Sequence, residues 1–209
     1  MIINDSVIKS LMEKLEGNNM KPYFCKTAFE AKELVMSLIP QGAVVTNGGS
    51  VTMKEIGVMD EVKERADITY LDRAKEGLTP EEVKEIYKKA FFADVYLMSS
   101  NALTLNGELY NVDGNGNRVA AMIYGPKQVI IVAGINKIVT DLHAAVDRLE
   151  TIASPANCIR LNKKTPCAMT GRCGHCNSND RICNDYVIMA HQREKDRIKV
   201  IFIADEFGY

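Results

Sequence analysis

Four cysteines near the C-terminus have the residue type and spacing of a metal site. Cys167, Cys173, Cys176 and Cys183 lie within one short segment, and two residues separate the middle pair. Such a pair can clamp one ion, and two further thiolates would complete a zinc site or hold an iron-sulfur cluster. The outer spacings fit neither a standard zinc finger nor a ferredoxin, so the metal stays undecided between zinc and iron-sulfur. Free thiols in a loop are the alternative.

A glycine-rich turn between an apolar run and a helical pattern could hold an anion. It consists of Asn47, Gly48, Gly49, Ser50 and Thr52. Glycines let backbone N–H groups turn toward a ligand, and the two hydroxyls can donate to phosphate or carboxylate. The alternative is an ordinary strand-to-helix turn that the serine caps.

A second polar segment, residues 101–118, combines two turns with a fixed cation. Asn106 and Gly107 form a hairpin dipeptide, and a second turn beginning at Asp113 precedes Arg118, which suits bidentate capture of an oxyanion. Two tight turns beside a solvated arginine are the alternative. The candidate ligand-binding residues of this segment are Asn101, Thr104, Gly107, Asn111, Gly114, Asn117 and Arg118.

Alternating strands and helices must position these segments. Periodicity predicts helices at 6–16, 27–39, 51–56, 79–91 and 142–149, and strands at 21–25, 43–46, 68–71, 95–98, 127–133, 186–191 and 200–204. This order indicates an α/β fold, with a mainly parallel sheet, helices on both faces, and ligands at the carboxyl ends of the strands. Periodicity fails from 155 to 185, which predicts a cysteine-rich excursion.

Length and composition favour a single domain over residues 1–209. The chain is 46% hydrophobic, which is enough for a sizeable core, and 26 Lys and Arg balance 27 Asp and Glu. A balanced charge gives no general attraction to nucleic acid or to a membrane surface. We find no signal peptide and no apolar run of membrane-spanning length, and therefore expect a cytoplasmic protein.

The polar segments and the cysteine cluster together resemble the LUD-domain (lactate utilisation) family. The resemblance is carried by residues 47–57, 101–118 and 165–184, and it spans most of the chain. It implies a Rossmann-like fold of the sugar-isomerase and CoA-transferase-like superfamily and a small anionic metabolite as ligand. It also implies a role in oxidising L-lactate beside iron-sulfur partner proteins. Since no flavin or nicotinamide fingerprint is present, an iron-sulfur cluster here or in a partner would relay the electrons.

Three functions follow as expectations. The first is a component of a 2-hydroxy-acid oxidation system, as a non-flavin subunit of an oxidoreductase complex. The second is a sugar-phosphate isomerase or CoA-transferase-like enzyme, with Glu55 or Asp113 as general base and zinc as a structural staple. The third is a non-catalytic sensor of redox state or metal. Assembly into a homo-oligomer is compatible with each of them.

Overall fold

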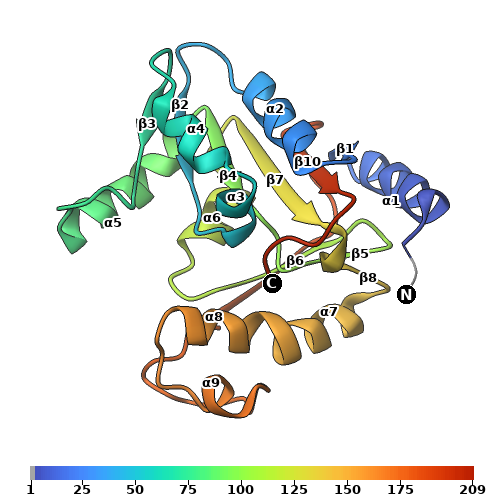
Figure 1. Ribbon diagram of the computed structural model, residues 1–209, viewed down its shortest axis with the longest axis vertical. Helices are drawn as coiled ribbons and strands as arrows, with labels where there is room; N and C mark the ends of the chain where they lie inside the picture. Colours follow the sequence, from blue (N-terminus) through green and yellow to red (C-terminus); the bar gives the residue numbers. More distant parts are fainter. Residues whose placement is uncertain (1–2) are drawn as a thin grey trace.

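A six-stranded parallel sheet forms the centre of the computed structural model, which describes residues 3–209 (Figure 1). The central strands β10, β7 and β4 are buried apolar runs, as expected for a parallel sheet that is covered on both faces. The order of the strands is β1-β10-β7-β4-β2-β3, and every pairing is parallel. The strands are β1 (Lys21–Cys25), β2 (Val44–Asn47), β3 (Thr69–Leu71), β4 (Val95–Met98), β7 (Gln128–Gly134) and β10 (Ile198–Ile203). The predicted α/β fold is therefore confirmed.

Helices cover both faces of this sheet, as the sequence predicts. On one face lie α2 (Ala28–Leu38), α3 (Val51–Glu55) and α4 (Val58–Glu64), which share a hydrophobic cluster with the sheet. The opposite face packs against α1 (Asp5–Gly17) and α6 (Asn117–Ile123) in a second cluster. The sheet is thus the middle layer of a sandwich of helices (Figure 1).

Local side-chain caps explain where several helices begin. Asn4, Thr27, Ser50 and Thr79 each accept a hydrogen bond from a backbone N–H group in the first turn. Thr79 also forms a reciprocal capping box with Glu82 at the start of α5 (Pro80–Lys89), which continues into the 3-10 turn η1 (Ala90–Phe92). The strands therefore end, and the helices begin, at positions that local sequence specifies.

A second, four-stranded sheet was not predicted from the sequence. It has the order β8-β5-β6-β9, formed by β8 (Ile138–Val139), β5 (Ala102–Thr104), β6 (Leu109–Asp113) and β9 (Asp185–Met189). The predicted hairpin at Asn106 and Gly107 is confirmed, because β5 and β6 pair in antiparallel fashion. Strand β9 joins this second sheet as an edge strand, whereas β10 returns to the parallel sheet. The outward-facing Tyr186 and Ile188 are each 49% exposed, which suits an edge position.

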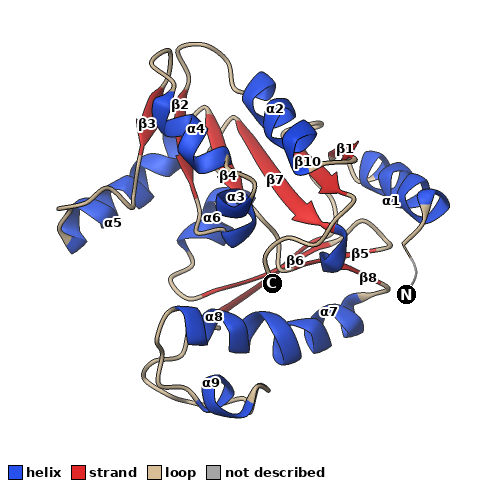
Figure 2. Ribbon diagram, in the orientation of Figure 1, coloured by secondary structure: helices blue, strands red, loops and turns tan. Residues whose placement is uncertain are grey.

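The expected irregular excursion at 155–185 is partly helical. Helix α7 (Leu142–Arg148) continues through a π-helical turn, η3 (Leu149–Ala153), into α8 (Ser154–Arg160), and α9 (Pro166–Thr170) follows. Pro155 lies in the first turn of α8, directly after the π-helical turn. The π-helical turn precedes this proline, so the helical path extends past the point where periodicity fails. Irregular chain occupies the loops on either side of α9 (Figure 2).

Candidate anion-binding cavity

A cavity of about 570 Å³ lies at the carboxyl ends of the central strands. One wall consists of the segments that follow β2 and β4, at residues 49–51 and 99–101, together with Lys137 in the 3-10 turn η2 (Ile135–Lys137), which follows β7. The rest of the lining comes from residues within 112–118, from the end of α8, from the loop at 179–184, and from Tyr209. Ligands of open α/β sheets commonly bind at this edge, which agrees with the expectation from the sequence.

Cationic side chains dominate the lining of the cavity. Two acids, Asp113 and Asp180, face a larger set of cations. The remaining polar lining is mainly serine and asparagine, which can donate hydrogen bonds to oxygen atoms. This composition suits a negatively charged ligand. The cations are Arg73, Arg118, Lys137, Arg160, Lys163 and Arg181.

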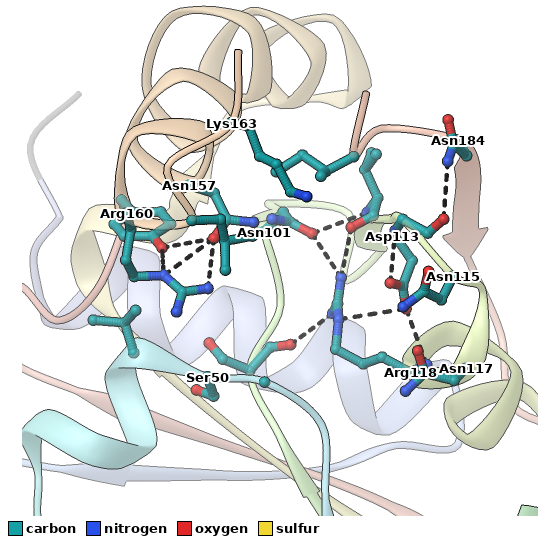
Figure 3. A pocket seen from close by; sticks show the side chains of 18 of the residues that line it. Ser50, Asn101, Asp113, Asn115, Asn117, Arg118, Asn157, Arg160, Lys163 and Asn184 are labelled. Atoms are coloured by element: carbon teal, nitrogen blue, oxygen red, sulfur yellow. Dashed lines mark hydrogen bonds and ion pairs between the residues drawn. The ribbon is translucent and has the colours of Figure 1, made fainter. Parts of the chain in front are cut away.

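Arg118 organises one wall of the cavity through four hydrogen bonds. One terminal nitrogen donates to Ser99 O (3.1 Å) and Asn111 Oδ1 (2.5 Å), and the other to Val112 O (2.8 Å) and Asn101 Oδ1 (3.1 Å). Figure 3 shows Arg118 beside Asn101. All four terminal N–H groups are thereby directed at protein oxygens. The sequence suggested that this guanidinium captures an oxyanion with two parallel bonds. These contacts tie together the ends of β4 and β6, and capture of an oxyanion by Arg118 stays a prediction.

Gly48 and Asn111 both contact the Arg118 side chain and help to hold it in place. A β-carbon on Gly48 would lie 2.8 Å from Arg118 Cγ, so only glycine lets the arginine stem pass. Asn111 is fully buried, and its amide nitrogen donates to Ser100 Oγ (3.0 Å) while its oxygen accepts from Arg118. Both residues belong to the predicted ligand-binding set, but neither lines the cavity.

The two predicted general bases have different positions. Asp113 lines the cavity, but its carboxylate accepts from Gly114 N (2.7 Å), Arg118 N (2.9 Å) and Val119 N (3.2 Å) at the start of α6. Glu55 lies outside the lining, and its carboxylate accepts from Gly208 N (2.7 Å). Asp113 therefore holds the α6 turn in place, and Glu55 holds the C-terminal segment against α3.

A cluster on α8 and the C-terminal segment forms the more exposed side of the cavity. Arg160 Nε donates to Tyr209 Oη (2.6 Å), which in turn donates to Asn157 Oδ1 (2.8 Å). Lys163 lies between this cluster and the Asp113 turn (Figure 3). Asp180 accepts from Lys164 N (2.8 Å), which holds the 179–184 loop against the end of α8. Cations therefore face the cavity from α8 and from Arg118 on the opposite side.

Lys137 is a lining residue that the sequence interpretation missed. Its side chain is 3% exposed, and its ammonium donates to Thr52 Oγ1 (2.9 Å) and Ser99 Oγ (3.0 Å). Burial, reinforced by the charges of Arg148 and Arg118, lowers the pKa of Lys137 to about 7. Its position directly after the predicted strand 127–133 was a usable signal, because that strand ends at the ligand edge.

The structure brings together about half of the predicted ligand-binding positions. Thr104 bonds to Glu108, and Gly107 lies at a hairpin tip with Asn18 beside it, so both are held by local structure away from the cavity. The predicted residues that line the cavity are Gly49, Ser50, Asn101, Asp113, Gly114, Asn117 and Arg118. Those that do not are Asn47, Gly48, Thr52, Glu55, Thr104, Gly107 and Asn111.

The four predicted metal ligands do not form a metal site in this arrangement. Cys167 is buried, and its sulfur lies 3.7 Å from that of Cys158 on α8. Cys173 accepts from His175 N (3.4 Å), and the carbonyl groups of Cys176 and Cys183 accept from Arg181. Within residues 3–209, no three His, Cys, Asp or Glu side chains are grouped so as to hold an ion. Burial raises the pKa of the Cys173 thiol, which disfavours the thiolate that a metal requires.

Fold and cavity together define an α/β protein with a cationic cavity at the carboxyl edge of a parallel sheet. The chain belongs to the LUD domain family, whose model matches residues 8–203. That family is associated with lactate utilisation.

Comparison with solved structures supports the fold. A DUF162 family protein from Deinococcus radiodurans is similar, with 12% sequence identity and a TM-score of 0.51, over 98% of this chain and all of that chain. A search of curated proteins gives no match. In the part of the chain that the structure describes, no helix has both the length and the apolar character needed to cross a membrane.

Proposed function

We propose that this protein binds an anionic metabolite in the cationic cavity and thereby serves in the utilisation of lactate or a related 2-hydroxy acid. The single observation that carries the proposal is the excess of cations over acids at the ligand edge of the sheet. Arg160 and Lys163 on the exposed side meet the ligand first, and buried Lys137 lies deepest. Family membership supports the process, and the cavity supports the charge of the ligand.

The size of the cavity favours a ligand larger than lactate itself. A cavity of about 570 Å³ falls in the range that encloses drug-sized molecules, and lactate has only six non-hydrogen atoms. Cations on opposite sides would leave a single carboxylate close to only some of them. We therefore infer a ligand with an extended or second anionic group, such as a phosphorylated compound, that acts with or in place of lactate.

Titration calorimetry tests this proposal. L-lactate, pyruvate and dihydroxyacetone phosphate are titrated into the protein at low and high salt. We expect the phosphorylated compound to bind more tightly than lactate, and its affinity to fall as salt screens the cavity charge. Lys163→Met should weaken binding about tenfold, the usual effect of losing one charged contact.

The matched control is Lys88→Met. Lys88 lies on α5, outside the cavity, with a side chain that is 72% exposed. Lys88→Met removes the same charge from the protein as Lys163→Met does. Equal weakening of anion binding by the two variants would therefore indicate general electrostatics. Absence of binding by all three anions would contradict the proposal.

A four-cysteine metal or iron-sulfur centre stays a second proposal. What supports it is the sequence spacing of the four cysteines, of which Cys173 and Cys176 are separated by only two residues. Since the thiols are not grouped around an ion here, loading would require the 171–184 loop to rearrange. Metal analysis and a visible spectrum on protein purified without oxygen test this. Iron with sulfide, lost in Cys173→Ser, would support an electron-transfer role. Zinc would support a structural metal site, and the absence of any metal would contradict the proposal.

A further inference from the structure

Binding of an anionic ligand does not by itself explain why the amine of Lys137 is buried in the cavity. Lys137 ends the 3-10 turn η2, which follows β7, and it lines the cavity, yet its side chain is 3% exposed. Lysines are seldom so deeply buried, because removing an ammonium from water is costly. If the cavity needed only positive charge, its exposed cations would already supply it.

The hydrogen bonds around Lys137 Nζ show which of its N–H groups or its lone pair has no partner. The Thr52 hydroxyl donates to Phe207 O (3.1 Å), and the Ser99 hydroxyl donates to Ser100 O (3.4 Å). Because each hydroxyl has one proton, both must accept from Lys137 Nζ, at 2.9 and 3.0 Å. A neutral amine has two N–H groups and one lone pair. The two hydroxyls therefore engage both N–H groups and leave the lone pair unbonded.

The electrostatic surroundings favour the neutral amine. Arg148 on α7 and Arg118 on α6 oppose its protonation, and together with burial they bring its pKa to about 7. Glu55 on α3 acts in the opposite direction but is the smallest influence, and no ion pair within residues 3–209 includes Lys137. A substantial share of the molecules thus has an uncharged amine near neutral pH. Desolvation beside other cations is a known way to make a lysine nucleophilic.

We propose that Lys137 is a catalytic nucleophile that forms an imine with a carbonyl compound bearing a carboxylate or phosphate group. This rests on the proposed function, because the cavity cations supply the recognition of the anionic group. A 2-oxo acid, the product class of 2-hydroxy-acid oxidation, and a ketose or aldose phosphate both have this chemistry. The inference adds a covalent step that anion binding alone does not include.

The reaction is a condensation that needs no further reactant. The lone pair of Lys137 Nζ attacks the carbonyl carbon and forms a C–N bond, while the π-electron pair of the carbonyl moves onto its oxygen. One N–H proton transfers to that oxygen, which gives a carbinolamine. Loss of water, with the second N–H proton, leaves the C=N bond. Thr52 and Ser99 bond to the two N–H groups that carry these protons and so hold the amine in the attacking orientation.

Reductive trapping tests the proposal. The full-length protein is incubated with pyruvate, or with dihydroxyacetone phosphate, and sodium cyanoborohydride at neutral pH, and intact mass and peptide maps are recorded. We expect one adduct per chain with at least one probe, equal to the mass of the probe less one oxygen atom, located at Lys137. The exposed Lys88 gives an internal reference for unspecific labelling in the same digest.

Two variants and one parallel measurement make the result decisive. Lys137→Met and Lys137→Arg should both lose the adduct, the second while keeping a charge at the position. If neither variant folds, the peptide map of the wild-type protein still locates the adduct. Labelling that is no stronger at Lys137 than at Lys88, or no labelling, overturns the imine. Calorimetry with the same probes separates the two proposals: binding without an adduct removes the imine and leaves the anion site, whereas an absence of both removes the two together.

Discussion

At the scale of single residues, Arg118 shows how a cation that lines a cavity can also organise the protein around it. Its four bonds join main-chain and side-chain oxygens of two segments, the one after β4 with Ser99 and Asn101 and the end of β6 with Val112. Burial lowers its pKa, yet an arginine keeps its charge throughout the physiological range. The charge therefore contributes to the field in the cavity while the N–H groups fix its wall.

Arg118→Lys should separate these two contributions. Lysine keeps the charge but cannot reach four oxygens in a planar arrangement, so buried acceptors lose their partners. We expect unfolding in urea to show a loss of about 2 to 4 kcal/mol. The control is Arg172→Lys, at a side chain that is 66% exposed and should change little. Equal stability of the two variants would show that the four bonds contribute nothing.

Two neighbouring glycines offer a matched pair on the same turn. A β-carbon at Gly48 would lie 2.8 and 2.9 Å from the Arg118 stem and 3.1 Å from Tyr96 Oη, whereas at Gly49 the nearest atom is 3.9 Å away. We expect Gly48→Ala to lower stability by about 1 to 3 kcal/mol, since the crowded arginine must shift. Gly49→Ala should change it by less than about 0.5 kcal/mol. Thermal unfolding of both variants measures the difference, and similar losses would show that general glycine loss, not contact with Arg118, is responsible.

At the scale of elements, the C-terminal segment and α8 are coupled through a single hydroxyl. Tyr209 Oη accepts from Arg160 and donates to Asn157, so it holds the arginine at the cavity. Tyr209→Phe removes only this oxygen. We expect anion affinity to fall about threefold to tenfold, the effect of one hydrogen bond, with little change in stability. Calorimetry measures it, with Tyr124→Phe as control because that ring is 79% exposed and lies outside the cavity. Unchanged affinity would mean that Arg160 needs no such support.

The elements also show what could be predicted from the sequence. The parallel sheet follows from buried apolar runs and helix caps, which are local patterns, and the segments after residues 47 and 101 were located because glycine and asparagine turns are local too. The edge strand β9 and the helical start of the excursion depend on long-range pairing and on packing of Leu149 and Ala153 against the second sheet. Single-sequence periodicity does not contain that information.

The candidate site, like the fold, has features that the sequence predicts and features that depend on the three-dimensional structure. Arg118 was identified as important, but its task depends on which oxygens surround it in three dimensions. Arg160 looks like an ordinary surface cation in the sequence, Lys137 has only its place after a predicted strand as a signal, and the assembled fold brings both into one cavity. The cysteine spacing predicts a metal site, whereas within residues 3–209 the thiols are not grouped around an ion and Cys167 packs against Cys158; the metal centre stays a prediction.

At the scale of the whole molecule, the buried Lys137 makes stability depend on pH. Its pKa is about 7 in the folded protein and 10.5 when solvated, so between these values the unfolded chain binds a proton that the folded chain lacks. Stability from this group therefore rises with pH across that window, by up to about 1.4 kcal/mol per unit. Below pH 7 both states are protonated, and the folded state bears the full cost of a buried charge.

Lys137→Met removes this dependence and therefore tests it. The stability of the variant relative to wild type should be highest at pH 6 and should decline steadily toward pH 9, as measured by urea unfolding at several pH values. Other titrating groups are common to both proteins and cancel in the difference. Lys88→Met serves as control and should show a difference that does not vary with pH, because its side chain is 72% exposed. A flat difference for Lys137→Met would mean that its amine stays charged in the folded protein, and it would remove the electrostatic basis for a nucleophile at the buried end of the cavity.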